Sequence, residues 1–195
     1  MPYTMPIQYG IREVCDLKFY ELADDGGKKG TDPVFMIDTA KTSTLESATT
    51  TVYAQGGKGN PRLIAWEGEK TLTFTVEDAL ISKEGLELLT GDIVTTDDGV
   101  ITIDQNHFAG YYYVEADSLI RRESNGKDYP LTIVLPRVKV QSGFSISMAP
   151  TGDPSTFNYV MDAFPGYVET KPQDGEDNRK KVICQMTIGK EAVTD

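Results

Sequence analysis

Thr71-Leu72-Thr73-Phe74-Thr75-Val76 decides the fold class, because apolar and polar residues alternate strictly along it. Successive side chains of an extended strand point to opposite faces, so Leu72, Phe74 and Val76 share one face and the threonines share the other. β-branched and aromatic residues also favour strands. The stretch therefore predicts a half-buried antiparallel strand with one core face and one polar face.

The same alternation recurs along the chain between clusters of Gly, Asp, Asn and Pro, which predicts a mainly β protein. Three hairpins are expected, each with a Gly-containing turn between two strand-like runs. They pair residues 61–66 with 71–76 through Glu67-Gly68, residues 92–96 with 100–103 through Asp97-Asp98-Gly99, and residues 111–123 with 129–140 through Asn125-Gly126. Residues 144–148 and 181–188 are two further strand-like segments.

Two prolines, Pro130 and Pro136, interrupt the second strand of the third hairpin. A proline has no backbone N–H, so it removes one donor from the ladder of a sheet. This strand is therefore expected either to lie at a sheet edge or to carry bulges at the prolines.

One segment has the spacing of a helix instead. Ser82 is a suitable N-cap, Leu86, Leu88 and Leu89 supply an apolar side, and Gly91 is a typical stop signal. Such a short helix needs a sheet to pack against. The sequence thus predicts one domain over residues 1–195, an antiparallel β-barrel or sandwich with one short flanking α-helix.

Extended loops are expected near residues 23–33, 55–62 and 170–180. The first and third contain Gly, Pro and charged residues but almost no apolar side chains. Each is either a floppy surface loop or a segment that contact with something else, such as a neighbouring subunit, brings into order.

Charge and composition limit the function. The chain has 195 residues, with 19 Lys and Arg against 30 Asp and Glu, so its net charge is −11. Binding to nucleic acid phosphates depends on clustered Lys and Arg, which makes this acidic chain a poor candidate for it. No apolar run approaches the roughly 20 residues that span a bilayer.

The N-terminus lacks the features of a secretory signal, so we expect the product to begin in a cytoplasm. Cys15 and Cys184 are the two cysteines. Each lies in an apolar strand-like segment, which favours two buried free thiols over a disulfide.

Residues that carry catalysis or bind cofactors are scarce. His107 is the single histidine, and we expect it on the surface or in a turn. The chain has no Gly-x-Ser-x-Gly motif, and the glycine loop after Gln55 lacks the Gly-Lys-Ser/Thr ending of a phosphate loop. The acidic pairs do not have calcium-loop spacing.

Tyr111-Tyr112-Tyr113 is followed by acidic residues, which favours core and interface packing over base stacking. We therefore expect no catalytic residue, no cofactor and no metal.

Five phrases of the sequence resemble the tail tube proteins of contractile-tailed bacteriophages. They are residues 36–45 (MIDTAKTSTL), 52–62 (VYAQGGKGNPR), 66–80 (WEGEKTLTFTVEDAL), 136–143 (PRVKVQSG) and 161–165 (MDAFP). None of them is a catalytic signature.

The resemblance implies a β-barrel-like sandwich with a flanking helix, as in R-type bacteriocin and type VI secretion tube proteins. It implies a structural, non-enzymatic virion protein whose hexameric rings stack into a conduit for DNA ejection. The expected location is the virion tail, after assembly in the host cytoplasm. The expected partners are other copies of the chain and the sheath, baseplate and tail terminator proteins. DNA would pass through the lumen without specific binding, and excess carboxylates would repel it over about 8 Å at physiological salt; the same charge could instead serve only solubility.

Sheet edges and exposed loops are the natural contacts between such subunits. Two loops are our candidates for the subunit interface. They consist of Asp24, Asp25, Gly26, Gly27, Lys28, Lys29, Gly30, Thr31 and Asp32, and of Gln55, Gly56, Gly57, Lys58, Gly59, Asn60, Pro61 and Arg62. The alternatives are another virion component, such as a capsid decoration protein, and a carbohydrate-binding module or hydrolase on a β-sandwich that uses Trp66, tyrosines and carboxylates.

Overall fold

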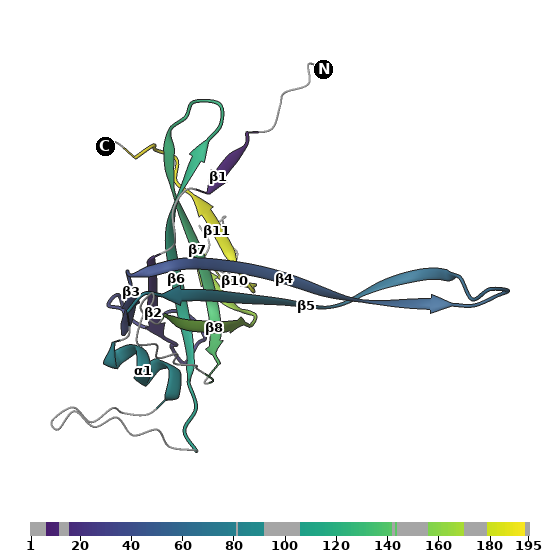
Figure 1. Cartoon of the computed structure of the whole chain (residues 1–195), viewed down its shortest axis with the longest axis horizontal. Coiled ribbons are helices and arrows are strands. Elements are labelled where there is room, and N and C mark those ends of the chain that lie inside the picture. Colours follow the sequence, from purple (N-terminus) through teal and green to yellow (C-terminus); the bar gives the residue numbers. More distant parts are fainter. Residues whose placement is uncertain are drawn as a thin grey trace, which may run out of the picture.

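A computed structural model describes residues 7–11, 16–80, 82–91, 106–141, 143, 156–169 and 179–193. One helix and eleven strands form within these residues (Figure 1). The strands are β1 (Tyr9–Ile11), β2 (Asp16–Glu21), β3 (Phe35–Ile37), β4 (Ala40–Gln55), β5 (Arg62–Asp78), β6 (Tyr111–Arg122), β7 (Asp128–Val140), β8 (Phe157–Ala163), β9 (Gly166–Glu169), β10 (Arg179–Val182) and β11 (Gln185–Ile188). The helix α1 spans Lys83–Thr90.

Nine of the strands form one sheet, in the order β3-β2-β6-β7-β8-β5-β4, with β1 added to β6 and β11 added to β7. β9 and β10 form a separate ladder. All of the pairings are antiparallel. The predicted class, mainly antiparallel β with one short helix, is confirmed. Within the described residues the edge strands β3 and β4 do not pair with each other, so the sheet is not closed into a barrel.

The hairpin of β6 and β7 forms at the predicted Asn125-Gly126 turn. Gly126 has a φ of 65°, which glycine adopts without steric cost, and its N–H donates to the carbonyl of Arg122 at 2.9 Å. Asn125 Oδ1 accepts a hydrogen bond from the backbone N–H of Lys127 at 3.1 Å. Local turn chemistry therefore fixes this reversal.

β7 accommodates Pro136 at a bulge and not at a sheet edge, whereas Pro130 pairs with Leu119 of β6 without a register shift, so the bulge expected at Pro130 does not form. β7 lies inside the sheet, between β6 on one side and β8 and β11 on the other. Its register with β6 shifts between Tyr112 and Val114, which places Pro136 and Arg137 opposite the single residue Tyr113. The predicted bulge at Pro136 is confirmed, because the extra residue removes the need for a donor at the proline.

The helix begins and ends where the sequence predicts. Ser82 is the N-cap, and its side chain accepts a hydrogen bond from the N–H of Gly85 at 3.0 Å. Gly91 ends the helix with a φ of 74°, and its N–H donates to the carbonyl of Glu87 at 2.8 Å. Both caps satisfy backbone groups that the helix itself leaves without partners.

The hydrophobic core lies between the sheet and the helix (Figure 1). Leu86 and Leu89 of α1 are buried together with side chains from six strands. The fully buried members of the core include Leu17, Phe19, Ile37, Phe74, Val76, Val114, Leu135, Val138, Val140, Tyr159 and Met161. Phe74 and Val76 are the core-facing residues predicted from the alternation, and Leu72 packs at the margin of the same cluster.

The predicted turn at Glu67-Gly68 is wrong. β5 runs without reversal from Arg62 to Asp78 and pairs along its length with β4. Gly68 instead lies at a bulge, where the register shifts between Thr49 and Thr51 of β4. The chain reverses direction earlier, at residues 56–61, where Gly57, Gly59 and Asn60 have positive φ.

The segment 181–188 is also not one strand. β10 and β11 are separated at residues 183 and 184 and belong to different sheets. Cys184 lies between them, half-buried and not in a disulfide, and burial raises the pKa of its thiol. The hairpin predicted at 92–103, the strand at 144–148, Cys15 and residues 170–178 lie outside the described residues; Arg179 and Lys180 belong to β10.

Candidate subunit interface

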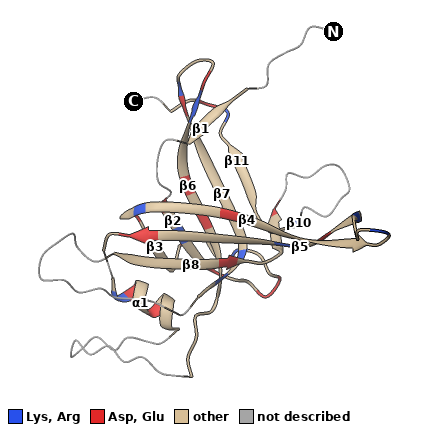
Figure 2. Cartoon of the chain, turned by 45° about the vertical axis from the view of Figure 1, so that its right-hand side comes forward, with Lys and Arg blue, Asp and Glu red and all other residues tan. Residues whose placement is uncertain are grey.

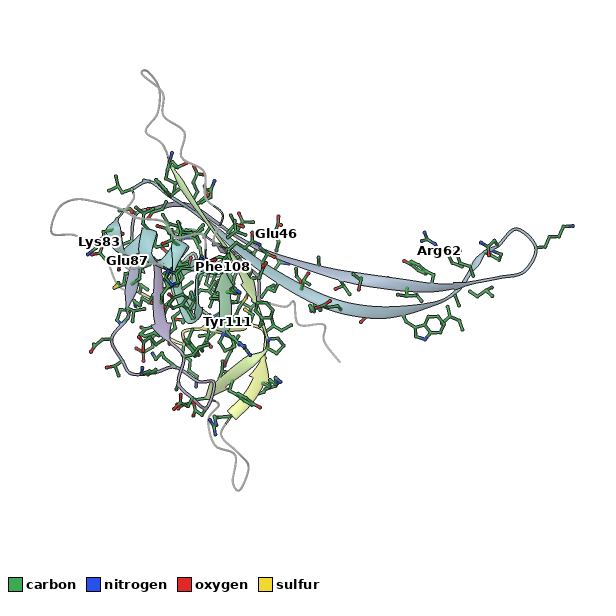
Figure 3. All side chains as sticks on the ribbon, turned by 90° about the horizontal axis from the view of Figure 1, so that it is seen from below. Glu46, Arg62, Lys83, Glu87, Phe108 and Tyr111 are labelled. Atoms are coloured by element: carbon green, nitrogen blue, oxygen red, sulfur yellow. The ribbon has the colours of Figure 1, made fainter. Side chains whose placement is uncertain are left out.

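A long two-stranded arm extends from the body of the molecule (Figures 1 and 3). β8 pairs with β5 only over residues 72–78, whereas β4 and β5 pair with each other from Ala40 to Gln55. Beyond Ser47 and Leu72, each of the two strands therefore has the other as its sole ladder partner among the described residues. An isolated two-stranded ribbon is marginally stable in water, so this part of the arm has the properties of a segment that docks on another surface.

The tip of the arm is the predicted glycine loop, residues 55–62. Its turn is held by hydrogen bonds from the N–H of Asn60 to the carbonyl of Gly57 at 3.1 Å and from the N–H of Gly56 to the carbonyl of Pro61 at 3.3 Å. Gly57 and Gly59 have φ values of 85° and 89°. These conformations favour glycine, which explains why the loop is rich in it.

One face of the outer arm is apolar and exposed. Val52 pairs with Trp66, and Ala54 pairs with Ile64, so their side chains share that face. Trp66 is 53% exposed and Val52 is 61% exposed. Fully burying a side chain of this kind contributes about 1.5–3 kcal/mol. Contiguous exposed apolar surface of this sort marks an interaction site.

The tip of the arm is basic. Lys58 and Arg62 are the only charged residues between Ser47 and Trp66, so this stretch carries a charge of +2 in a chain of −11. The guanidinium of Arg62 lies 4.2 Å from the ring centroid of Tyr53, a cation–π contact that holds it against the arm. Figure 2 shows basic residues at the end of the arm.

The second predicted segment, Asp24–Asp32, lies on the body and not on the arm. It follows β2 and is tied to its own chain at both sides. Arg179 of β10 forms an ion pair with Asp25 at 2.6 Å, and Lys28 forms one with Glu115 of β6 at 3.0 Å. These two ion pairs hold part of the loop against its own chain. Fewer of its residues therefore need a neighbouring subunit to become ordered than the sequence suggests.

Aromatic residues lie under this loop. The ammonium of Lys28 lies 4.3 Å from the ring centroid of Tyr20, and Tyr20 packs edge-on against Tyr113. A cavity of about 500 Å³ separates the loop from the sheet, with Tyr113, Glu115 and Tyr167 in its lining. Burial, with the nearby Glu115 and Glu169 carboxylates, raises the pKa of Tyr113 to about 12, so this phenol stays neutral at physiological pH.

The other candidates from the sequence do not form a reaction centre in the described part of the chain. His107 is exposed, as predicted. Tyr112 packs edge-on against Phe19, and Tyr111 packs edge-on against Phe164, which agrees with packing roles for the tyrosines. No group of three His, Cys, Asp or Glu side chains is placed to hold a metal ion in that part of the chain. It also has no helix long and apolar enough to cross a membrane.

The apolar face of the arm was not among the predicted interface residues. Residues 61–66 were predicted to form a core hairpin with residues 71–76, with Gly68 in its turn. A signal was nevertheless present: the cluster Gly56-Gly57-Lys58-Gly59-Asn60-Pro61 is a stronger turn signal than one Glu-Gly pair. With the turn placed there, the runs before and after it become the two strands of a single long hairpin.

The described residues thus form an open antiparallel sheet with a capped helix on its flank and a protruding arm that exposes an apolar face. A family model settles the class further. The chain belongs to the YomU/Tube protein family, a phage tail tube family, whose model matches residues 9–100 and 94–175. Members of the family are structural proteins, and membership places this chain in the tail tube of a virion as a subunit of a homo-oligomeric tube. A search of curated proteins gave no match.

Proposed function

We propose that this chain assembles as stacked hexameric rings into the conduit through which phage DNA is ejected. The single observation that carries the proposal is the outer arm, which exposes Val52, Ile64 and Trp66 on a two-stranded ribbon that pairs with no further strand in the described part of the chain. A monomer gains nothing from such a surface, whereas a polymer of identical copies buries it at every contact.

The two loops predicted from the sequence take different roles in this proposal. The tip, Gln55–Arg62, makes contact with a neighbouring copy because it is the farthest point of the arm. The body loop, Asp24–Asp32, forms a second contact around the ring, with Asp24, Lys29, Gly30, Thr31 and Asp32 exposed on its outer side. The sheath, baseplate and tail terminator proteins are the further partners, and assembly takes place in the host cytoplasm.

The acidity of the chain fits a conduit for DNA. Each Lys or Arg that binds a phosphate slows the passage of a duplex, whereas carboxylates on the lumen wall repel it within a Debye length of about 8 Å. The DNA then moves through the tube without specific binding. Solubility alone is the competing explanation of the charge.

The experiment shortens the arm. Ala48 and Thr71 are register partners, so residues 49–70 can be replaced by a two-residue Asn-Gly turn that closes a shorter hairpin. Negative-stain images of the intact chain at high concentration should show rings or tubes, and the shortened chain should remain monomeric while still unfolding in one cooperative thermal transition.

A variant that lacks residues 24–32 tests the body loop in the same assay and should also fail to assemble. Intact protein that stays monomeric even with a preformed tube end would contradict the proposal. Closed oligomers without stacking would favour the alternative of a capsid decoration protein.

A further inference from the structure

The tip of the arm needs a receiving surface, and the body offers a groove of opposite charge. It lies between α1, the end of β2 and the segment that enters β3, and has a volume of about 270 Å³. Three glutamates line it: Glu21, Glu84 and Glu87. Its floor is apolar and aromatic, with Phe35, Leu88 and Tyr112. We refer to this surface as the α1 groove.

The α1 groove combines acidic and apolar surface, as the tip combines basic and apolar surface. Val34 at its margin is 49% exposed. At the tip, Leu63 is the extra residue of a bulge in β5, is 64% exposed and directly follows Arg62. The tip therefore offers the cation Arg62 beside the apolar Leu63, and the α1 groove offers glutamates beside the apolar Val34.

Lysines of the same chain balance part of the charge in the α1 groove. Lys83 lies 3.7 Å from Glu87, and Lys29 lies 2.5 Å from Glu21. These are exposed ion pairs, which are individually weak and easily exchanged. Glu84 is exposed in the first turn of α1 and carries the remaining charge.

Position in the molecule supports the same pairing. α1 and β3 lie at one end of the molecule and the arm points away from the other end (Figure 1). Figure 3 shows Glu87 and Arg62 at these opposite ends. A contact between unlike surfaces at opposite ends is heterologous, so it repeats from copy to copy and builds an assembly instead of a closed dimer.

A second apolar hollow at the root of the arm fits the tip less well. It has a volume of about 440 Å³ and is lined by Leu45, Leu72 and Met186. Its charged lining residue is Lys70, which has the same sign as Lys58 and Arg62 and would repel them.

We propose that the basic tip of the arm, with Lys58, Arg62 and Leu63, docks in the α1 groove of the next copy of the chain. This inference rests on the proposed function, because it names the receiving surface for the same arm. The inference predicts that the contact depends on the charge of the tip and on the charge of the α1 groove, two surfaces that lie far apart in each copy.

The test uses charge reversal on each side separately. Variant one is Lys58→Glu with Arg62→Glu, and variant two is Glu84→Lys with Glu87→Lys. Each alone brings like charges together, so the concentration needed for assembly should rise by at least about tenfold in sedimentation assays. In an equimolar mixture both possible contacts join opposite charges, and assembly should return to within about threefold of the unmodified chain, with the two variants alternating.

Controls place a single charge reversal of each sign elsewhere on the surface. Lys180→Glu on β10 and Glu123→Arg beside the β6–β7 turn should assemble as the unmodified chain does. Circular dichroism and a cooperative melt establish that each variant is folded. Should the double lysine variant fail to fold, the neutral pair Glu84→Gln with Glu87→Gln replaces it and should weaken assembly less, with a reduced dependence on salt.

The outcomes separate this inference from the proposed function. Assembly of the glutamate-to-lysine variant at the normal concentration would overturn the α1 groove as the docking site and leave the tube proposal intact. Failure of the mixture to assemble would also overturn it, because complementary charges would then not suffice. If the unmodified chain itself does not assemble, both proposals are wrong.

Discussion

Tyr159 of β8 and Gly85 of α1 are in direct contact, and a Cβ added at Gly85 would lie 2.3 Å from the phenolic oxygen of Tyr159. The same Cβ would lie 3.2 Å from the ring of Phe35. Tyr159 has no exposed surface, so its ring has no space into which to move. Glycine at position 85 is what allows the helix to approach the sheet this closely.

We expect Gly85→Ala to destabilise the protein. Alanine favours a helix over glycine by about 1 kcal/mol, but forcing a methyl group into a filled core costs about 1–3 kcal/mol. The expected net loss is up to about 2 kcal/mol in the free energy of unfolding, measured by urea denaturation. Adding Tyr159→Phe should recover much of the loss, and an alanine variant as stable as the parent would show that the helix can shift.

Tyr159→Phe alone should stabilise the fold by about 1 kcal/mol. Within the described part of the chain, the buried hydroxyl of Tyr159 has no hydrogen-bond partner, so the folded state bears the cost of removing it from water. Thermal and urea unfolding measure the difference. Tyr129→Phe is the matched control, because that exposed hydroxyl accepts a hydrogen bond from Asn125 at 2.9 Å, and its loss should change stability by less than about 0.5 kcal/mol. A less stable Tyr159→Phe protein would contradict this reasoning.

Alkaline pH should unfold the protein through its buried tyrosines. Burial raises the pKa of Tyr113 to about 12 in the folded state and raises that of Tyr159 as well. The unfolded chain releases these protons near pH 10. The stabilisation is thus complete below pH 10 and is lost as pH rises toward 12, by about 1.4 kcal/mol per pH unit for each tyrosine. Urea midpoints between pH 8.5 and 11.5 measure this slope, and Tyr113→Phe should make it shallower.

Trp66 should report assembly directly. It is the single tryptophan of the chain and is 53% exposed on the arm. If the arm docks on another copy, its surroundings become less polar, so the fluorescence emission should shift to shorter wavelength and iodide should quench it less. The shortened arm lacks the residue, and Trp66→Ala should raise the concentration needed for assembly. Tubes with the emission of an exposed tryptophan would contradict burial of this face.

Gly68→Ala should impair assembly without weakening the core. A Cβ at this position would lie 2.4 Å from Oγ1 of Thr50 and 3.2 Å from its carbonyl oxygen. The bulge would have to open or move, and a slip of one residue turns the outer side chains to the opposite face. Core unfolding, followed by urea denaturation, should change by less than about 0.5 kcal/mol. Adding Thr50→Ser keeps the hydroxyl and serves as a control, whereas Thr50→Gly should relieve the contact.

Much of the fold follows from local signals. The Ser82 and Gly91 caps, the Asn125-Gly126 turn and the bulge at Pro136 were all predicted, because each depends on the conformational preferences of neighbouring residues. An extended loop at residues 55–62 was also predicted, and it forms the turn between β4 and β5. The error at Glu67-Gly68 arose because one glycine permits either a turn or a bulge, and the choice depends on a partner strand.

The sequence by itself determined the strand-rich class, the helix and its caps, the acidic charge and the absence of a recognisable catalytic motif, since these depend on composition and short-range periodicity. Only the tertiary structure decided that β4 and β5 extend beyond the other strands of the sheet, that Trp66 lies outside the core, and that Glu84 and Arg62 occupy opposite ends of the molecule. The alternation of apolar and polar residues indicates that a strand has an apolar face, but it does not indicate which part of the protein covers that face. That depends on which distant strands pair, and over what length.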